Sequence, residues 1–289
     1  MLQPTQGPTH LRALLNKGGL ITAPGVYDGL SARIAEAAEF EALYISGGAI
    51  ARSMGYPDVG LVTQTEMIKR LEEIRAVTSL PLIVDADTGY GNAINVVRTI
   101  RAYERAGAAA LHIEDQVEPK RCGHYEGKEI VSAHEMEQKI RAAIEAREQS
   151  ELVIIARTDA RAVSGLEAAI ERGNVYAEAG ADMIFVEAPQ SVEEIERIAQ
   201  EVHAPLLINM FWGGKTPLVP ADQLAALGYR LMIVPSDLQR AAIRAMQRAA
   251  AVIRQDGNTA AMADAMVSFA EREEVIGKSD IEVLQKRFL

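Results

Sequence analysis

Leu82-Ile83-Val84-Asp85 is a short apolar run that is followed by a helix-like segment at 93–106, by Gly107 and by a second apolar run, Ala110–Glu114. The spacing of apolar residues in 93–106 is that of an amphipathic helix, and a glycine directly after it is typical of a helix C-terminus. These residues therefore predict a strand, a helix and a second strand parallel to the first.

The same alternation is repeated eight times along the chain. We expect strands at 20–23, 42–46, 82–85, 110–114, 152–157, 183–187, 206–209 and 231–234, with helices such as 31–39, 64–77, 93–106 and 133–147 between them. Gly180 and Gly228, like Gly107, stand between a helix and the next strand. Eight such units in about 240 residues suit a closed (β/α)₈ TIM barrel.

An open, doubly wound sheet is the alternative fold. Its first strand-to-helix turn would carry a glycine-rich dinucleotide loop, and Ala23-Pro24-Gly25-Val26-Tyr27-Asp28 is not one. No linker interrupts the chain, so we predict a single domain over 1–289, with the barrel at about 18–250 and a helical arm at 251–289. This extra helical segment is expected to pack on another subunit or to form a local lid.

Composition excludes several classes of function. The 289 residues carry a formal charge of −10, which argues against nucleic-acid and anionic-membrane binding, although it allows a small anionic substrate in a locally cationic pocket. A single cysteine excludes an intramolecular disulfide and favours a reducing compartment. We find neither a secretion signal nor a transmembrane segment and expect a cytoplasmic protein.

Polar residues are placed at the ends of the expected strands. The set comprises Ser46, Asp85 with Asp87, His112 with Glu114, Arg157 with Asp159, Glu187 and Asn209. In a (β/α)₈ barrel the carboxyl ends of the strands form the active-site face, so these side chains are expected to converge. Capping of the following helices would explain only one or two of them.

Asp85 and Asp87 point to the same side of an extended strand, beside His112 and Glu114 on the next one. Such carboxylates repel one another unless a cation lies among them, and oxygen ligands favour Mg²⁺, with Mn²⁺ as a substitute, over Zn²⁺. Asp58 is a further candidate ligand from the second loop. The alternative is a set of buried salt bridges to Arg157 or Lys120.

The only cysteine lies in Lys120-Arg121-Cys122-Gly123-His124, where no apolar residue flanks it. A lone cysteine is commonly a small core residue. Neighbouring cations, by contrast, predict a thiol of lowered pKa that reaches solvent or ligand. We therefore expect this loop to bring a proton donor and positive charge to an anion.

Several of these motifs, in order over about 20–248, closely resemble the isocitrate lyase / phosphoenolpyruvate mutase superfamily. They are Ser46-Gly47-Gly48, Pro57-Asp58, the run 85–92, Glu114-Asp115-Gln116, the run 120–124, the run 156–160 and Gly214-Lys215-Thr216-Pro217. The resemblance implies a (β/α)₈ barrel whose last helix is exchanged between subunits, a homotetramer and a Mg²⁺ ion. It also implies Asp85 as the direct ligand, with Asp58, Asp87 and Glu114 acting largely through water.

The cysteine run is similar to that of the carbon–carbon lyase branch, which includes 2-methylisocitrate lyase, 2,3-dimethylmalate lyase and oxaloacetate hydrolase. Carboxyphosphonoenolpyruvate mutase carries the same run. The resemblance implies a Mg²⁺-bound 2-hydroxydicarboxylate that is split by retro-aldol cleavage into a 2-oxo acid and a carboxylate-stabilised carbanion. Arg121, His124 and Arg157 would supply positive charge, and Cys122 would supply the proton as general acid.

The remaining candidates are individually weaker. Backbone N–H groups of Ser46, Gly47 and Gly48 are expected either to bind a carboxylate or to form a tight turn, and Tyr44 either relays the hydroxyl proton or packs. The matched motifs add, as substrate-binding residues, Lys120, Gly123, Glu187, Asn209, Thr216 and Pro217. Arg240, just after the eighth expected strand, is expected either to bind a further substrate carboxylate or to be a solvated residue in the first turn of a helix. Trp212 replaces the acidic or small residue expected in relatives, which leaves substrate specificity open.

Three activities remain as alternatives: the lyase, a carboxyphosphonoenolpyruvate phosphonomutase, and an oxaloacetate hydrolase or decarboxylase on the same metal platform. A non-catalytic scaffold would be expected to have lost Asp85 or Cys122, and both are present.

Overall fold

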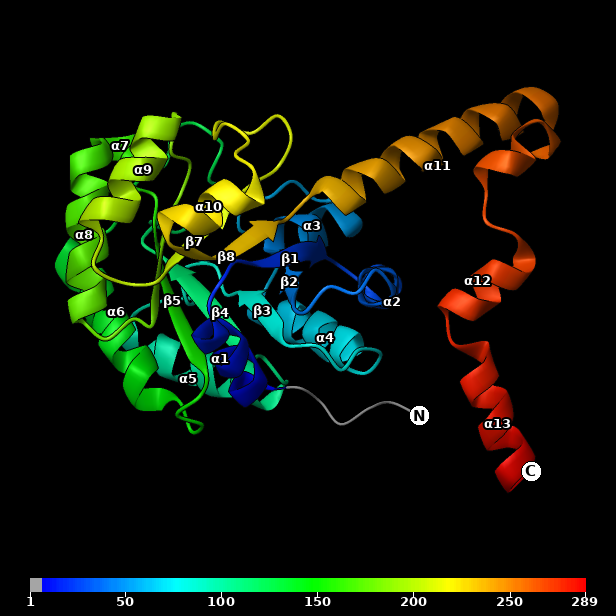
Figure 1. Ribbon diagram of the computed structural model, residues 1–289, viewed down its shortest axis with the longest axis horizontal. Coiled ribbons are helices and arrows are strands. Elements are labelled where there is room, and N and C mark those ends of the chain that lie inside the picture. The colour runs from blue at the N-terminus through cyan, green and yellow to red at the C-terminus, as the bar shows by residue number, and fades with distance from the viewer. Residues whose placement is uncertain (1–6) are drawn as a thin grey trace.

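The computed structural model describes residues 7–289 and contains a barrel of eight parallel strands closed in sequence order (Figure 1). The strands are β1 Ile21–Val26, β2 Leu43–Ile45, β3 Leu82–Asp85, β4 Ala110–Glu114, β5 Val153–Thr158, β6 Met183–Val186, β7 Leu206–Asn209 and β8 Tyr229–Val234. Closure is made by β1 against β8, where Ile21 lies opposite Leu231. The predicted (β/α)₈ barrel is thus confirmed and the open sheet is excluded.

Helices surround the strands and continue beyond them. They are α1 Pro8–Lys17, α2 Gly29–Ala37, α3 Gly47–Ser53, α4 Gln64–Arg75, α5 Ala93–Arg105, α6 Ala133–Ala146, α7 Ala160–Ser164, α8 Leu166–Glu178, α9 Val192–Glu201, α10 Ala221–Leu227, α11 Asp237–Asp256, the 3₁₀ helix Ala260–Ala265, α12 Phe269–Val275 and α13 Lys278–Phe288. Gly107, Gly180 and Gly228 have φ of 95°, 106° and 100°. Because this left-handed region favours glycine, they end their helices as predicted.

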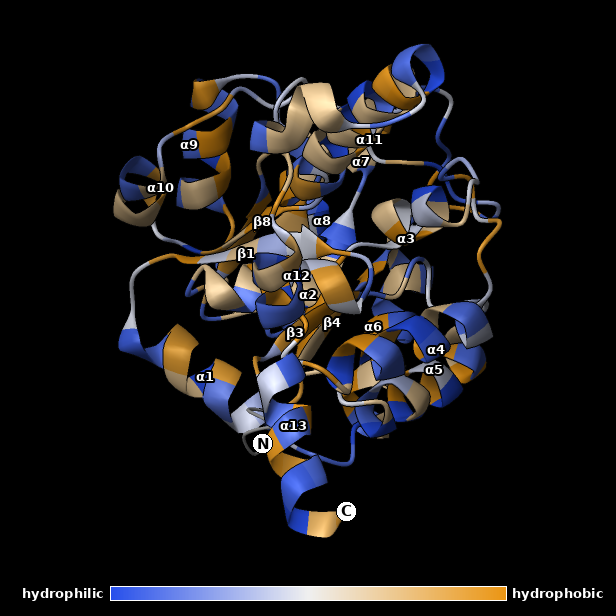
Figure 2. Ribbon diagram, turned by 90° about the vertical axis from the view of Figure 1, so that its right-hand side faces the viewer, coloured by the Kyte–Doolittle hydropathy of each residue, from blue (hydrophilic) through white to orange (hydrophobic). Residues whose placement is uncertain are grey.

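Alternation along each strand divides the core into two layers. Side chains such as Leu111 and Ile154 pack outward against the helices, whereas Ile155 and Phe185 fill the barrel interior. Leu11 of α1 joins the interior cluster, so α1 packs beneath the barrel strands. Figure 2 shows the hydrophobic strands at the centre and hydrophilic stretches on the outer helices. Because apolar side chains fill the barrel interior, a site can form only at the polar ends of the strands.

The C-terminal segment leaves the barrel along α11 (Figure 1). The predicted boundary between barrel and arm, at residue 250, lies inside this helix. Large apolar side chains on the segment are exposed, among them Met246, Ile253, Phe269 and Phe288. Within residues 7–289, no helix combines the length and the apolar character that crossing a membrane requires.

Candidate active site

A cavity of about 550 Å³ lies at the carboxyl ends of the strands. The predicted residues that line it are Tyr44, Ser46, Gly48, Asp58, Asp85, Lys120, Arg121, Cys122, Gly123, His124, Arg157, Glu187, Asn209 and Arg240. The other predicted residues are not part of the described lining: Gly47, Asp87, His112, Glu114, Asp159, Thr216 and Pro217. Most of the polar strand ends therefore converge, as expected from the barrel geometry.

Among the residues outside the lining, Gly47 closely approaches a residue that belongs to it. A Cβ atom on Gly47 would lie 2.7 Å from Oδ2 of Asp85, so glycine is needed for this close approach. Thr216 is buried, and its hydroxyl has no hydrogen-bond partner among the described residues. Pro217 is half-buried in the same loop.

Asp85 is a buried carboxylate at the floor of the cavity. Its Oδ1 accepts a hydrogen bond of 3.0 Å from the backbone N–H of Asp87 and lies 3.6 Å from Nε2 of His112. Burial opposes ionisation, but His112, Lys120 and Arg157 together hold the pKa of Asp85 below its ordinary value. Within residues 7–289, no lysine or arginine nitrogen lies within 4.0 Å of this carboxylate, which leaves a negative charge facing the cavity.

Lys120 joins two other carboxylates. Its Nζ lies 2.6 Å from Oδ1 of Asp58 and 2.7 Å from Oδ1 of Asp87. Burial nevertheless raises the pKa of Asp87 to about 7. Asp58 and Asp87 thus form the buried salt bridges to Lys120 that were expected as the alternative to metal binding. Glu114 forms one as well, because its Oε2 lies 3.0 Å from Nη1 of Arg157.

The oxygen donors of the cavity suit a divalent cation that keeps most of its waters. Across residues 7–289, no three His, Cys, Asp or Glu side chains come together as a ready-made metal cluster. Mg²⁺ keeps several of its waters and needs only one or two carboxylates. Asp85 supplies one, and the buried Oε1 of Glu114 has no hydrogen-bond partner among the described residues, so it has the capacity to accept from a water. These residues fit a hydrated, oxygen-ligated ion.

Arg157 is fixed by three carboxylates. Its guanidinium lies 3.0 Å from Glu114, 3.0 Å from Asp159 and 3.5 Å from Glu187. The same group lies over the ring of Phe185, 5.3 Å from the ring centroid. Arg157 is therefore a rigid positive wall of the cavity, with little freedom to move toward a ligand.

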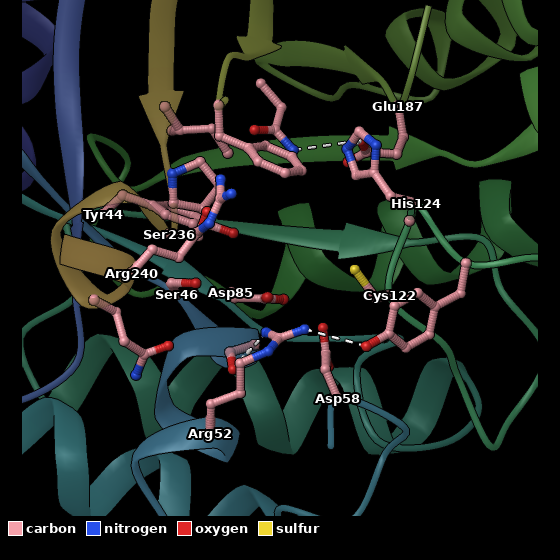
Figure 3. Close-up of a pocket in the computed structure, with 18 of the residues that line it drawn as sticks. Tyr44, Ser46, Arg52, Asp58, Asp85, Cys122, His124, Glu187, Ser236 and Arg240 are labelled. Carbon is pink, nitrogen blue, oxygen red and sulfur yellow. Dashed lines mark hydrogen bonds and ion pairs between the residues drawn. The ribbon is translucent and has the colours of Figure 1, made fainter. Parts of the chain in front are cut away.

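Cys122 is half-buried, and its sulfur is directed toward the centre of the cavity (Figure 3). Burial, with the charge of Asp58, raises the pKa of the thiol above its ordinary value, so the expected lowered pKa is wrong. The reason is the direction of the neighbouring cations: Lys120 turns to Asp58, and Nη1 of Arg121 donates to the carbonyl of Glu126. The thiol remains protonated and can act as a proton donor.

His124 connects the cysteine loop to two other elements. Its Nδ1 accepts a hydrogen bond of 3.0 Å from the backbone N–H of Lys215, and its Nε2 lies 3.0 Å from Oε1 of Glu187. Because Nδ1 is an acceptor, the neutral ring carries its proton on Nε2. Despite burial, Arg157 and His124 lower the pKa of Glu187 far below its ordinary value.

The cysteine loop is seated against the barrel. A Cβ atom on Gly123 would lie 2.5 Å from Nη2 of Arg157 and 2.5 Å from Cγ of Glu187, so only glycine allows this approach. Nζ of Lys128 donates to the carbonyl of Gly123 and lies 2.6 Å from Asp159. The backbone of the loop therefore forms part of the cavity wall.

Sequence reasoning missed several lining residues, namely Arg52, Tyr125, Phe185, Phe211, Ser236, Gln239 and Ile243. Arg52 lies within α3, and a helix assigned directly after β2 would have brought it toward the site. Trp212 is 70% exposed at the rim, and its carbonyl accepts from Nη1 of Arg240. The apolar residues carried no comparable signal because their types are those of ordinary core positions.

Known proteins resemble this chain over nearly its whole length. A family model described as phosphoenolpyruvate phosphomutase matches residues 11–254. The 2,3-dimethylmalate lyase of Eubacterium barkeri is 43% identical over 96% of this chain and 96% of its own. The 2-methylisocitrate lyase of Aeropyrum pernix is 47% identical over 94% of this chain and 88% of its own.

Solved structures of proteins from the same superfamily also resemble this chain. A 2,3-dimethylmalate lyase has a TM-score of 0.91 at 40% identity, covering 97% of this chain and 94% of that one. An oxaloacetate acetylhydrolase with 3,3-difluorooxalacetate has a TM-score of 0.93 at 36% identity, covering 98% and 97%. A phosphonopyruvate hydrolase with oxalate and Mg²⁺ has a TM-score of 0.89 at 32% identity, covering 97% and 98%.

Proposed function

Because the chain belongs to the phosphoenolpyruvate phosphomutase family and is a carbon–carbon lyase of the isocitrate lyase / phosphoenolpyruvate mutase superfamily, we propose that it cleaves a branched 2-hydroxydicarboxylate of the 2-methylisocitrate or 2,3-dimethylmalate type. A retro-aldol cleavage breaks the C2–C3 bond, gives a 2-oxo acid and leaves the second fragment as a carbanion that needs a proton. The cavity offers a group for each of these requirements.

Asp85 would hold a divalent cation, Mg²⁺ or Mn²⁺, with Asp58, Asp87 and Glu114 contacting its waters. When bound, this ion supplies Lewis-acid stabilisation of the oxygen on C2. The solved phosphonopyruvate hydrolase that resembles this chain contains Mg²⁺ with oxalate, a small dicarboxylate.

Tyr44 and His112 lie beside Asp85 and would carry away the proton of the substrate's hydroxyl group on C2. The phenolic oxygen and Nε2 of the imidazole are 2.8 Å apart, which is hydrogen-bond distance. Both groups are buried, so a proton moving between them does not exchange directly with bulk water.

Cys122 would protonate the carbanion. The proposal chiefly depends on the observation that the Cys122 thiol and the Asp85 carboxylate line the same cavity. The pKa of the thiol is raised by burial, and that of the carboxylate is lowered by neighbouring positive charge. Arg157 stabilises the developing negative charge from a fixed position, while Asn209 and Glu187 shape the side of the cavity where the second fragment lies. His124 lies on the same side of the cavity, with its Nε2 3.0 Å from Oε1 of Glu187.

A substrate panel tests the proposal. The protein with Mg²⁺ is incubated separately with 2-methylisocitrate, 2,3-dimethylmalate, oxaloacetate and isocitrate, and the released 2-oxo acid or oxalate is measured. Turnover of one of the first two is expected. Turnover of oxaloacetate alone would indicate the hydrolase, and turnover of none would leave the carboxyphosphonoenolpyruvate mutase as the activity to assay.

The exposed C-terminal segment supports a proposal about assembly. The apolar residues Met246, Ile253, Phe269 and Phe288 are exposed on helices that lead away from the barrel. We propose that α11 and the following helices are exchanged with a neighbouring subunit in a homotetramer. Light scattering should then give four times the chain mass of 31.3 kDa, and a monomer would contradict the proposal.

A further inference from the structure

Arg52 lies on the cavity wall, on α3, and takes no part in the proposed cleavage (Figure 3). Its Nη1 donates a hydrogen bond of 2.8 Å to the carbonyl of Gly48, and its Nη2 donates one of 3.4 Å to the hydroxyl of Tyr125. The side chain is accessible to solvent, and among residues 7–289 no carboxylate lies within the 4.0 Å of an ion pair.

Three other cations of the cavity are engaged by carboxylates. Lys120 lies between Asp58 and Asp87, and Arg157 lies among three carboxylates. Arg240 faces Asp237 at 3.5 Å. A guanidinium has five N–H donors, and Arg52 uses two, both on neutral oxygens. Of these four cations, Arg52 alone has no carboxylate within 4.0 Å in the described structure, although the charge of Asp58 acts on it. Arg121, which also lines the cavity, has no such carboxylate either, but its Nη1 is turned to the carbonyl of Glu126.

The surroundings of Arg52 are built to place it. A Cβ atom on Gly48 would lie 2.8 Å from Nη1 of Arg52 and 2.7 Å from Oδ2 of Asp58, so glycine makes room for both groups. Tyr125 approaches from the cysteine loop, three residues after Cys122. The guanidinium is therefore held between the start of α3 and the loop that carries the proposed acid.

We propose that Arg52 binds a substrate carboxylate beyond those of the 2-hydroxydicarboxylate unit, so that the enzyme prefers a three-carboxylate substrate of the 2-methylisocitrate type over a two-carboxylate one. This rests on the proposed function. A guanidinium matches a carboxylate by two parallel N–H···O bonds, and such charge-assisted bonds are about twice as strong as neutral ones. The third carboxylate would give Arg52 a direct ion-pair partner, which no carboxylate of residues 7–289 supplies within 4.0 Å.

Steady-state kinetics of Arg52→Gln and Arg52→Lys with both substrates test the proposal. Arg52→Gln should raise KM for 2-methylisocitrate about tenfold or more, which is the scale of one lost charge-assisted hydrogen bond, and change KM for 2,3-dimethylmalate much less. Arg52→Lys should restore part of the loss. Equal changes for both substrates, or none, would overturn the role of Arg52.

A binding measurement separates this proposal from the proposed function. Calorimetry on the Mg²⁺-loaded protein compares tricarballylate with succinate, neither of which needs to react. A selective loss of tricarballylate binding in Arg52→Gln supports Arg52 even if no substrate turns over. Unchanged binding, or no tricarballylate binding by the unmodified protein, overturns it. Arg105→Gln, which removes an exposed ion pair with Glu148, is the matched control.

Discussion

The phenolic oxygen of Tyr44 lies 2.8 Å from Nε2 of His112, and the two rings stack with centroids 5.8 Å apart. Both side chains are buried among the apolar residues inside the barrel. Burial lowers the pKa of His112 to about 4 and raises that of Tyr44 well above its ordinary value. The pair is therefore neutral at physiological pH, beside a carboxylate, Asp85, that is charged.

Replacing Tyr44 by phenylalanine should lower kcat at least about a hundredfold, because the substitution removes the group proposed to move the hydroxyl proton. Packing is nearly unchanged, so the melting temperature should fall by only a few degrees. Tyr103→Phe is the control. The buried hydroxyl that it removes lies 2.9 Å from the hydroxyl of Tyr90, and neither tyrosine belongs to the described cavity lining. Equal kcat values for the two variants would contradict a catalytic Tyr44.

The lowered pKa of His112 makes stability depend on pH. An unfolded chain protonates this histidine near pH 6.5, but the folded protein does so only near pH 4. Between these values the unfolded state binds more protons, so this group lowers the free energy of unfolding as pH falls, by up to about 3 kcal/mol. Asp87, whose pKa is raised to about 7, acts in the opposite direction.

The His112 contribution is isolated by comparison with His112→Gln. Urea unfolding at several values between pH 4 and 6.5 should show a stability that falls more steeply with acid in the unmodified protein than in the variant. Parallel curves would mean that His112 titrates alike in the folded and unfolded states.

The fold was largely predictable because the barrel repeats one pattern eight times. Three of the expected strands, Leu82–Asp85, Ala110–Glu114 and Leu206–Asn209, have the observed bounds. Others differ by a few residues at their ends, as for β8, which begins at Tyr229 rather than at 231. Strand ends depend on pairing across the barrel, and single-segment patterns do not contain this information.

The site was predictable where residues occupy strand ends and not where side chains turn within loops. Asp85 and Glu187 followed from position alone, whereas the direction of Lys120, away from the thiol, did not. Adjacent cations in the sequence suggested a lowered thiol pKa, but burial and Asp58 decide it. Charged residues that are adjacent in sequence therefore do not predict the pKa of a neighbouring group when their side chains bind partners elsewhere.

Cys122 gives a direct test of the raised thiol pKa. It is the only cysteine of the chain, so alkylation by iodoacetamide can be followed by the mass of the intact protein. At pH 7.5 the reaction should be slower than that of a free thiol such as glutathione, and it should accelerate as pH rises above 9. Fast labelling at neutral pH would show a thiolate and contradict the raised pKa.

The role of the thiol as acid is tested separately. Cys122→Ser should keep divalent-metal binding and lower turnover at least about a hundredfold, the scale of a lost acid catalyst. Cys122→Ala is the second variant, because it removes the polar atom as well. A serine variant with nearly normal turnover would mean that another group donates the proton.

Metal binding at Asp85 can be measured without activity. After treatment with a chelator, Mg²⁺ or Mn²⁺ should restore turnover and should also raise the melting temperature of the unmodified protein, since a ligand at a hundred times its Kd stabilises the folded state by about 2.7 kcal/mol. Asp85→Asn should lose this thermal shift, because the amide no longer supplies a charged oxygen to the cation.

Asp222→Asn, at an exposed position in the first turn of α10, is the control and should keep the full shift. Asp58→Asn should retain part of it, because Asp58 is expected to contact the ion through water and already has Lys120 as a partner. If Asp85→Asn and Asp222→Asn show the same metal-dependent shift, the cation binds elsewhere, and the assignment of Asp85 as its direct ligand is wrong.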